Sequence, residues 1–92
     1  MVNFLGARPI REHVDGAPHQ PGDHVVIVAA VDVDVHDVTP FVGLVGVVEY
    51  LEYECGSGQH FPDDPMIGVR FRDGRGEEFW SDELAIGKRR TA

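Results

Sequence analysis

Two adjacent aspartates, Asp63 and Asp64, lie between prolines in the segment Phe61-Pro62-Asp63-Asp64-Pro65. Such a pair could bind a metal, act as a catalytic acid–base pair, present negative charge to a cationic partner, or simply solvate a turn. Adjacent residues of an extended segment point to opposite sides, so we do not expect these carboxylates to share a proton. The prolines fix the backbone of a turn. We therefore expect one or both aspartates to face a partner.

The segment VDVDVHDV, residues 31–38, places Asp32, Asp34 and His36 two residues apart, a spacing at which side chains share one face of a strand. Such side chains run parallel about 6–7 Å apart, whereas metal sites draw convergent ligands from several elements. The five histidines are scattered, with no Cys-x-x-Cys or His-x-Glu pattern near them. We therefore expect no metal site and no cofactor, and interpret residues 31–38 as a solvated strand face or an excursion loop.

The chain offers no convincing nucleophile. The single cysteine, Cys55, follows Glu54, and a neighbouring carboxylate disfavours the reactive thiolate. Ser57 and Ser81 are not set in a Gly-x-Ser-x-Gly elbow. A domain of this size also leaves little room for the pocket of about 300–1,000 Å³ that small-molecule sites occupy. We therefore predict that the protein is not an enzyme.

The charge of the chain is strongly unbalanced. Sixteen acidic residues face eight basic ones, for a net charge of -8, and three of the basic residues lie among the last five, at positions 88–90. A field of this sign repels phosphate backbones and steers the protein toward cationic surfaces. We expect the three arginines of one hairpin, Arg70, Arg72 and Arg75, to pair with the nearby acidic residues Glu77, Glu78 and Asp73. The charge therefore argues against direct nucleic-acid binding.

Length and composition indicate a single small domain. Hydrophobic cores rarely divide in a chain as short as 92 residues. No apolar run approaches the roughly 20 residues that cross a bilayer, and the N-terminus lacks the pattern of a signal peptide. One cysteine allows no intrachain disulfide and fits a reducing compartment. We therefore expect a cytoplasmic protein with no membrane contact, acting as a monomer.

Runs of β-branched residues separated by glycine and proline predict short strands. We expect strands at residues 24–31, 41–53, 66–72 and 77–81, a short helical turn at 81–84 that Ser81 caps, and a terminal strand from residue 85. Three phenylalanines, Phe41, Phe71 and Phe79, are expected in the core. This pattern predicts an all-β fold, a small five-stranded SH3-like barrel over residues 14–87, preceded by a flexible lead-in at 1–13 and followed by a basic, frayed tail at 88–92.

Carboxylates gather in three groups that a barrel can bring together: the excursion, the second strand and the turn before the third strand. Aromatic side chains lie among them and could supply apolar anchors. Aromatic anchors surrounded by carboxylates suit a basic partner that bears arginines. The candidate partner-binding residues are Asp32, Asp34, Asp37, Glu49, Glu52, Glu54, Phe61, Asp63, Asp64 and Trp80.

Several segments, in order and with near-equal spacing, resemble the CarS-type bacterial antirepressors over residues 12–86. The most specific is Phe61-Pro62-Asp63-Asp64-Pro65-Met66-Ile67. The others are Asp15-Gly16-Ala17-Pro18, Gly22 with Val25-Val26-Ile27-Val28, Phe41-Val42-Gly43 with Gly46-Val47-Val48, and Glu83-Leu84.

The resemblance implies an SH3-fold domain that binds the DNA-binding domain of a MerR-type winged-helix repressor. Such a domain covers the repressor's recognition helix with an acidic surface that imitates DNA, so the operator is released and light-induced carotenoid genes are transcribed. The excursion at residues 31–40 differs in composition from the family pattern but keeps its length and acidity, and the basic tail is also distinct. The identity of the repressor therefore stays open.

Two other functions are compatible with a small acidic barrel. SH3-like barrels also serve as non-catalytic accessory subunits of larger enzymes or electron-transfer complexes, a role that predicts an interface more apolar than acidic. A binder of proline-rich peptides needs an aromatic groove. The chain lacks the Ala-Leu-Tyr-Asp-Tyr and paired-tryptophan pattern of such grooves, so we rank this function last.

Overall fold

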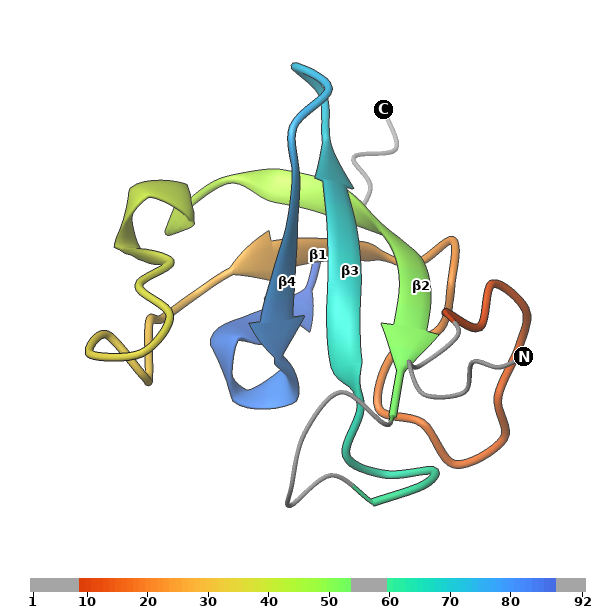
Figure 1. Cartoon of the computed structure of the whole chain (residues 1–92). Helices are drawn as coiled ribbons and strands as arrows, with labels where there is room; N and C mark the ends of the chain where they lie inside the picture. The colour runs from red at the N-terminus through yellow and green to blue at the C-terminus, as the bar shows by residue number, and fades with distance from the viewer. Residues whose placement is uncertain (1–8, 54–59, 88–92) are drawn as a thin grey trace, which may run out of the picture.

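The protein is built on one antiparallel sheet, shown by a computed structural model that describes residues 9–53 and 60–87 (Figure 1). The strand order is β4-β3-β2-β1-β5. Two single 3₁₀ turns, η1 and η2, are the only helical elements within the described residues. The elements are β1 (His24–Ile27), η1 (Thr39–Phe41), β2 (Val45–Glu52), β3 (Met66–Phe71), β4 (Gly76–Trp80), η2 (Ser81–Glu83) and β5 (Leu84–Ile86). The prediction of an all-β, five-stranded SH3-like fold is confirmed.

The long strand β2 bends, so that its first half pairs with β1 and most of its length runs along β3 (Figure 1). Gly46 lies where the backbones approach closely, since a Cβ there would stand 2.9 Å from the carbonyl oxygen of Arg70. Farther along, the register with β3 shifts between Val48 and Tyr50, which leaves Glu49 as the extra residue of a bulge. Bulges increase local twist and re-aim side chains. This bulge decides which β2 side chains face outward beyond it.

Apolar side chains from all five strands meet in one core. Phe71 and Phe79 are buried, as predicted, with ring centroids 6.0 Å apart. Phe41 is half-buried and covers the end of the core, stacked on Phe71 at 5.1 Å. Fully burying each such side chain contributes about 1.5–3 kcal/mol. The other core residues are Val14, Val25, Ile27, Val38, Val48, Leu51, Ile67, Val69 and Leu84.

The segment between β1 and β2, which we call the excursion (residues 28–44), is a loop and not a strand. The predicted first strand ends at Ile27 instead of Val31. The amides of Val35 and His36 both donate to the carbonyl of Asp32, at 3.1 and 2.8 Å, so the alternating stretch is folded into turns. Alternation alone cannot make a strand where no neighbouring strand supplies hydrogen bonds. The predicted second strand likewise begins at Val45 because η1 and a glycine turn at Gly43 (φ +95°) precede it.

The excursion is held by a buried carboxylate. Glu83 is fully buried in η2, and its side chain accepts hydrogen bonds from the amides of Val31 (2.9 Å) and Trp80 (3.0 Å). Its carbonyl accepts a third bond from the amide of Val28 at 2.8 Å. The helical turn expected at residues 81–84 is therefore present as a 3₁₀ turn, and the side chain of Glu83, not Ser81, caps it.

Near the N-terminus, Ile10 pairs with Leu51 through two backbone hydrogen bonds of 2.8 and 2.9 Å. This contact ties the segment before residue 14 to β2. The remainder of the predicted lead-in at 1–8 and the basic tail at 88–92 lie outside the described residues. Among the residues that the structure describes, no helix is long and apolar enough to span a membrane.

Candidate functional site

The outer surface of β2, β3 and β4 carries a cluster of acidic and aromatic side chains. The strand register places Glu52, Met66 and Trp80 in one row across the three strands. The next row contains Tyr50, Gly68 and Glu78. Side chains in register on adjacent strands share one face. We call this surface the acidic face, defined by Glu49, Tyr50, Glu52, Glu78 and Trp80.

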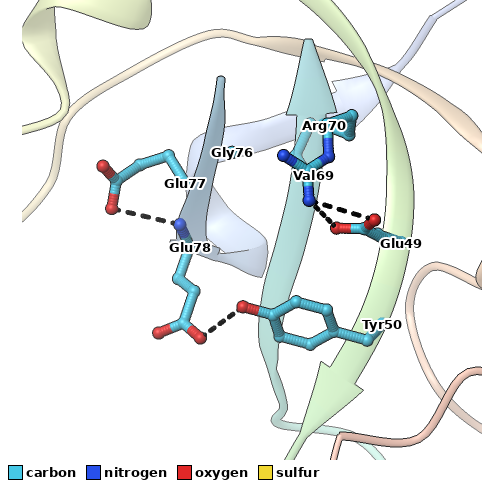
Figure 2. A pocket seen from close by; sticks show the side chains of 7 residues that line it. All are labelled: Glu49, Tyr50, Val69, Arg70, Gly76, Glu77 and Glu78. Carbon is cyan, nitrogen blue, oxygen red and sulfur yellow. Dashed lines mark hydrogen bonds and ion pairs between the residues drawn. The ribbon is translucent and has the colours of Figure 1, made fainter. Parts of the chain in front are cut away.

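The ring of Tyr50 lies directly over Gly68, where a Cβ atom would overlap it. Only glycine at position 68 allows this arrangement. The Tyr50 hydroxyl donates a hydrogen bond of 2.6 Å to Oε2 of Glu78 (Figure 2). Burial raises the pKa of Tyr50, and the hydrogen bond and charge of Glu78 raise it further, so the hydroxyl stays protonated as a donor. The tyrosine thus holds the Glu78 carboxylate in one position.

Glu52 and Glu78 form an interacting pair of carboxyl groups on this face. Partial burial raises the pKa of Glu52, and the charge of Glu78 and a hydrogen bond between the two side chains add to the effect. Like charges that share a site disfavour double ionisation. A cation placed between the two groups would remove that repulsion, and a guanidinium has the geometry to bind both.

Glu49 is less available, because arginines already neutralise it. Both of its carboxylate oxygens accept hydrogen bonds from the guanidinium of Arg70, at 2.9 and 3.1 Å. Arg11 approaches at 3.9 Å and also lies over the Tyr50 ring, 5.4 Å from its centroid. Beside these groups is a hollow of about 320 Å³, part of which Figure 2 shows. Its lining residues are Glu49, Tyr50, Val69, Arg70, Gly76, Glu77 and Glu78.

The excursion is attached to the edge of the sheet next to the acidic face. Nε2 of His36 lies 2.9 Å from the carbonyl oxygen of Glu78 and 2.9 Å from Oε2 of Glu77. This contact covers part of the outer edge of β4, which would otherwise be open to pairing with another chain. It also brings the loop that carries Asp32 and Asp34 to the side of β4. Asp34 is exposed and Asp32 half-buried.

Asp37, also on the excursion, has a local structural role. Its Oδ1 accepts hydrogen bonds from the amide of Thr39 (2.9 Å) and from the Thr39 hydroxyl (2.6 Å). The hydroxyl bond, followed by the amide bond, lowers the pKa of this exposed carboxyl group. Asp37 therefore stays ionised while it holds the start of η1.

The turn of residues 60–65 is fixed by packing around its prolines. The Tyr53 hydroxyl donates a 2.8 Å hydrogen bond to the carbonyl of Pro62, while the ring of Pro62 lies against Gly16. Phe61 packs edge-on against Tyr53 at 4.8 Å yet is 66% exposed. Pro65 is fully buried and leads directly into β3. The prolines thus set the path of the chain, as expected.

The two aspartates of this turn are positioned by that frame. Asp63 is exposed and Asp64 half-buried. Burial raises the pKa of Tyr53, and the negative charge of Asp63 raises it further, which means that the two side chains lie near each other. The turn enters β3 at Met66, which stands between Glu52 and Trp80 in the sheet. The turn and the acidic face therefore meet at the same end of β3.

Of the ten predicted site residues, Glu52 and Trp80 share a row, Glu49 lies in the adjoining bulge, and the aspartates come from two flanking loops. Glu54 lies outside the described residues. The prediction missed Glu78 and the positioning role of Tyr50. It paired the three arginines of the β3–β4 hairpin with Glu77, Glu78 and Asp73. The pair of Arg75 with Asp73 is present, whereas Arg70 binds Glu49. Strand alternation offers a signal for Glu78, since it precedes the buried Phe79 and must face the opposite side.

Among residues 9–53 and 60–87, no group of three or more His, Cys, Asp or Glu side chains is placed to hold a metal ion. The chain matches the family model of the CarS bacterial SH3 domain over residues 7–86, a range that includes all five strands, the excursion and the turn before β3. No curated protein and no solved structure matches it. The chain belongs to the CarS family of bacterial SH3 domains.

Proposed function

We propose that this protein is an antirepressor that binds the DNA-binding domain of a MerR-type repressor and releases its operator. In this proposal the acidic face takes the place of DNA phosphates and contacts the basic residues of the repressor. The observation that carries the proposal is the Glu52–Glu78 pair, fixed beside Tyr50 on the outer surface of the sheet. The net charge of -8 supports it by favouring a cationic partner.

In this proposal, an arginine of the repressor supplies the positive charge and the hydrogen-bond donors that the two carboxyl groups lack. Its planar guanidinium donates to two carboxylates at once, and charge-assisted bonds of this kind are about twice as strong as neutral ones. Because Glu78 is already oriented by Tyr50, little side-chain freedom is lost on binding. Trp80 is half-buried in the same row as Glu52 and offers an aromatic surface of the kind that anchors interfaces.

Exposed apolar side chains flank these carboxylates and extend the proposed contact. Phe61 projects from the turn before β3, and Val35 of the excursion is 80% exposed. Val33, between Asp32 and Asp34, is also exposed. A DNA-binding domain presents apolar as well as basic side chains, and interfaces combine an apolar centre with a charged rim. We therefore assign Asp32, Asp34, Phe61, Asp63 and Asp64 to the outer part of the contact.

The wider role follows from the family. By releasing the operator, the protein would allow transcription of the genes that the repressor silences, which in the light response of CarS-type systems are carotenoid genes. We propose that it acts in the cytoplasm as a monomer, without touching nucleic acid itself, without a cofactor and without catalysis.

The test is an operator-release gel shift with the purified DNA-binding domain of the MerR-type regulator encoded nearest to this gene. Adding the protein should free the DNA, and less so in high salt, because exposed charges are screened over about 8–10 Å at physiological ionic strength. Neutralising both carboxyl groups, Glu52→Gln with Glu78→Gln, should weaken release at least about tenfold, or about 1.4 kcal/mol.

The matched control is Asp23→Asn with Asp73→Asn, which removes the same charge outside the acidic face. It should release DNA like the unmodified protein. If both double variants release the operator equally well, the acidic face is not the binding site. If the unmodified protein neither releases DNA nor binds the regulator at any salt concentration, the antirepressor function is wrong and the accessory-subunit function takes its place.

A further inference from the structure

A second surface lies on the outer side of β1 and the first half of β2, and it adjoins the acidic face because Arg70, which pairs with Glu49, lines the hollows of both. Here the register aligns His24 with Val47 and Val26 with Val45. A groove of about 480 Å³ runs from His24 across β2 to β3, and its lining includes Val45, Val47, Arg70 and Arg72. We call this the valine surface, defined by His24, Val45, Val47 and Arg72.

The valine surface continues into a neighbouring hollow. That hollow, of about 240 Å³, shares Val45 and Arg72 with the groove and adds Leu44. Val45 is 55% exposed, and Val47 and Leu44 are exposed too. Within β2 the buried residues Gly46 and Val48 alternate with these valines, so strand pairing does not cover the outward side chains. Isolated exposed valines are ordinary, but a contiguous apolar strip with hollows on a small protein indicates a contact surface.

The charge beside these valines is positive, in contrast with the rest of the chain. Arg70 and Arg75 are paired with Glu49 and Asp73. Arg72 is exposed, and within the described residues it makes no hydrogen bond or ion pair. A free guanidinium next to an apolar groove complements an occupant that carries a carboxylate beside apolar groups.

The spacing of the groove residues points to an extended occupant. Val45 and Val47 are two residues apart on one strand face, so their side chains stand about 6–7 Å apart, the same interval as positions i and i+2 of an extended peptide. Arg72 adjoins Val45 in both hollows. A carboxylate at i+4 of such a peptide would reach the guanidinium if the chain runs from Val47 toward Val45.

We propose that the valine surface binds an extended acidic segment of a partner protein, with apolar residues at i and i+2 and a carboxylate at i+4. A second copy of this chain fits less well, because in a two-fold contact the valine surface faces itself, and none of its four defining residues is a carboxylate that could pair with Arg72. The proposed segment is chemically opposite to the basic partner of the acidic face. The protein would then be an adaptor with two adjoining binding surfaces of different chemistry, and this inference does not depend on the antirepressor proposal.

The experiment is a titration of the ¹⁵N-labelled full chain, followed by NMR, with the acetylated and amidated peptide GVSVSEG. The amide signals of Val45, Val47 and Arg72 should move, while those of Tyr50 and Glu52 stay in place. The peptide GVSVSKG, which carries a lysine in place of the carboxylate, should bind at least about tenfold more weakly. Arg72→Glu should reverse this preference, and Arg11→Glu, an equal charge change outside the valine surface, should leave it unaltered.

The reversal keeps the proposal falsifiable even if a single variant is less stable, since a misfolded protein would bind neither peptide. The proposal is overturned if neither peptide shifts the three amides at concentrations up to about 5 mM. Equal binding of both peptides also overturns it, because Arg72 then selects nothing. Sedimentation that shows a dimer, lost in Val45→Lys, would make a second copy the occupant instead.

Discussion

Removal of the buried carboxylate of Glu83 should lower the stability of the folded protein more than most other single substitutions of a polar residue. Glu83 is fully buried and receives the amides of Val31 and Trp80, at 2.9 and 3.0 Å. Its replacement by alanine leaves both donors without their acceptor. A hydrogen bond to a charged group contributes about 1.5–3 kcal/mol, and an unsatisfied buried donor costs about 1–3 kcal/mol.

The structure sets the size of the effect within that range. Val31 is exposed, so water can reach its amide once the carboxylate is gone, whereas Trp80 is half-buried. We therefore expect Glu83→Ala to lower the free energy of unfolding by about 3 kcal/mol, a large part of the 5–15 kcal/mol that small domains have. With a urea dependence of about 1 kcal/mol/M, the unfolding midpoint should fall by about 3 M.

Urea denaturation followed by tryptophan fluorescence measures this change, and amide hydrogen exchange at Val28 and Val31 shows whether the excursion is released. The stability of the Glu83→Gln variant should lie between that of Glu83→Ala and that of the unmodified protein, because its amide oxygen can still accept one hydrogen bond. The neighbouring Asp82→Ala, at an exposed position, should stay within about 0.5 kcal/mol. A loss below about 1 kcal/mol for Glu83→Ala would refute the view that this carboxylate holds the excursion in place.

Three further changes test the pH dependence and packing of the domain. Because the pKa of Glu52 is raised in the folded protein, its contribution to stability is complete below about pH 4.5 and is lost as the pH rises through the folded pKa. Glu52→Gln should therefore raise the urea midpoint at pH 7 but leave it unchanged below about pH 4.5. Burial lowers the pKa of His19 from 6.5, and the charge of Asp23 only partly opposes this, so its contribution is present above about pH 6.5 and is lost on acidification. Melting scans should therefore show a smaller loss between pH 7 and pH 5 for His19→Leu than for the unmodified protein; an equal loss would contradict the assignment. Gly68→Ala should cost about 1–3 kcal/mol in urea unfolding by displacing the Tyr50 ring, and the cost should largely vanish alongside Tyr50→Ala.

Local patterns in the chain were sufficient to predict most of the sheet. β3 and β4 were expected within one or two residues of their observed bounds, because β-branched and aromatic residues there are bordered by clear turn residues. The same reasoning was wrong at residues 28–31 and 41–44. Apolar residues there, VAAV and FVGL, continue the apolar composition of the neighbouring strands, but their backbone groups bond within turns, to η2 or across to the end of β1.

The acidic character of the proposed binding surface, and the family to which the chain belongs, could be inferred from residue types and their order alone. The partners of each carboxylate could not. Glu52 meets Glu78 because β3 lies between their strands and a bulge at Glu49 sets the register. Arg70 reaches Glu49, whereas Arg72 has no ion-pair partner among residues 9–53 and 60–87. Side-chain pairing over such sequence separations depends on strand register, which is determined by packing of the whole core and not by any local segment.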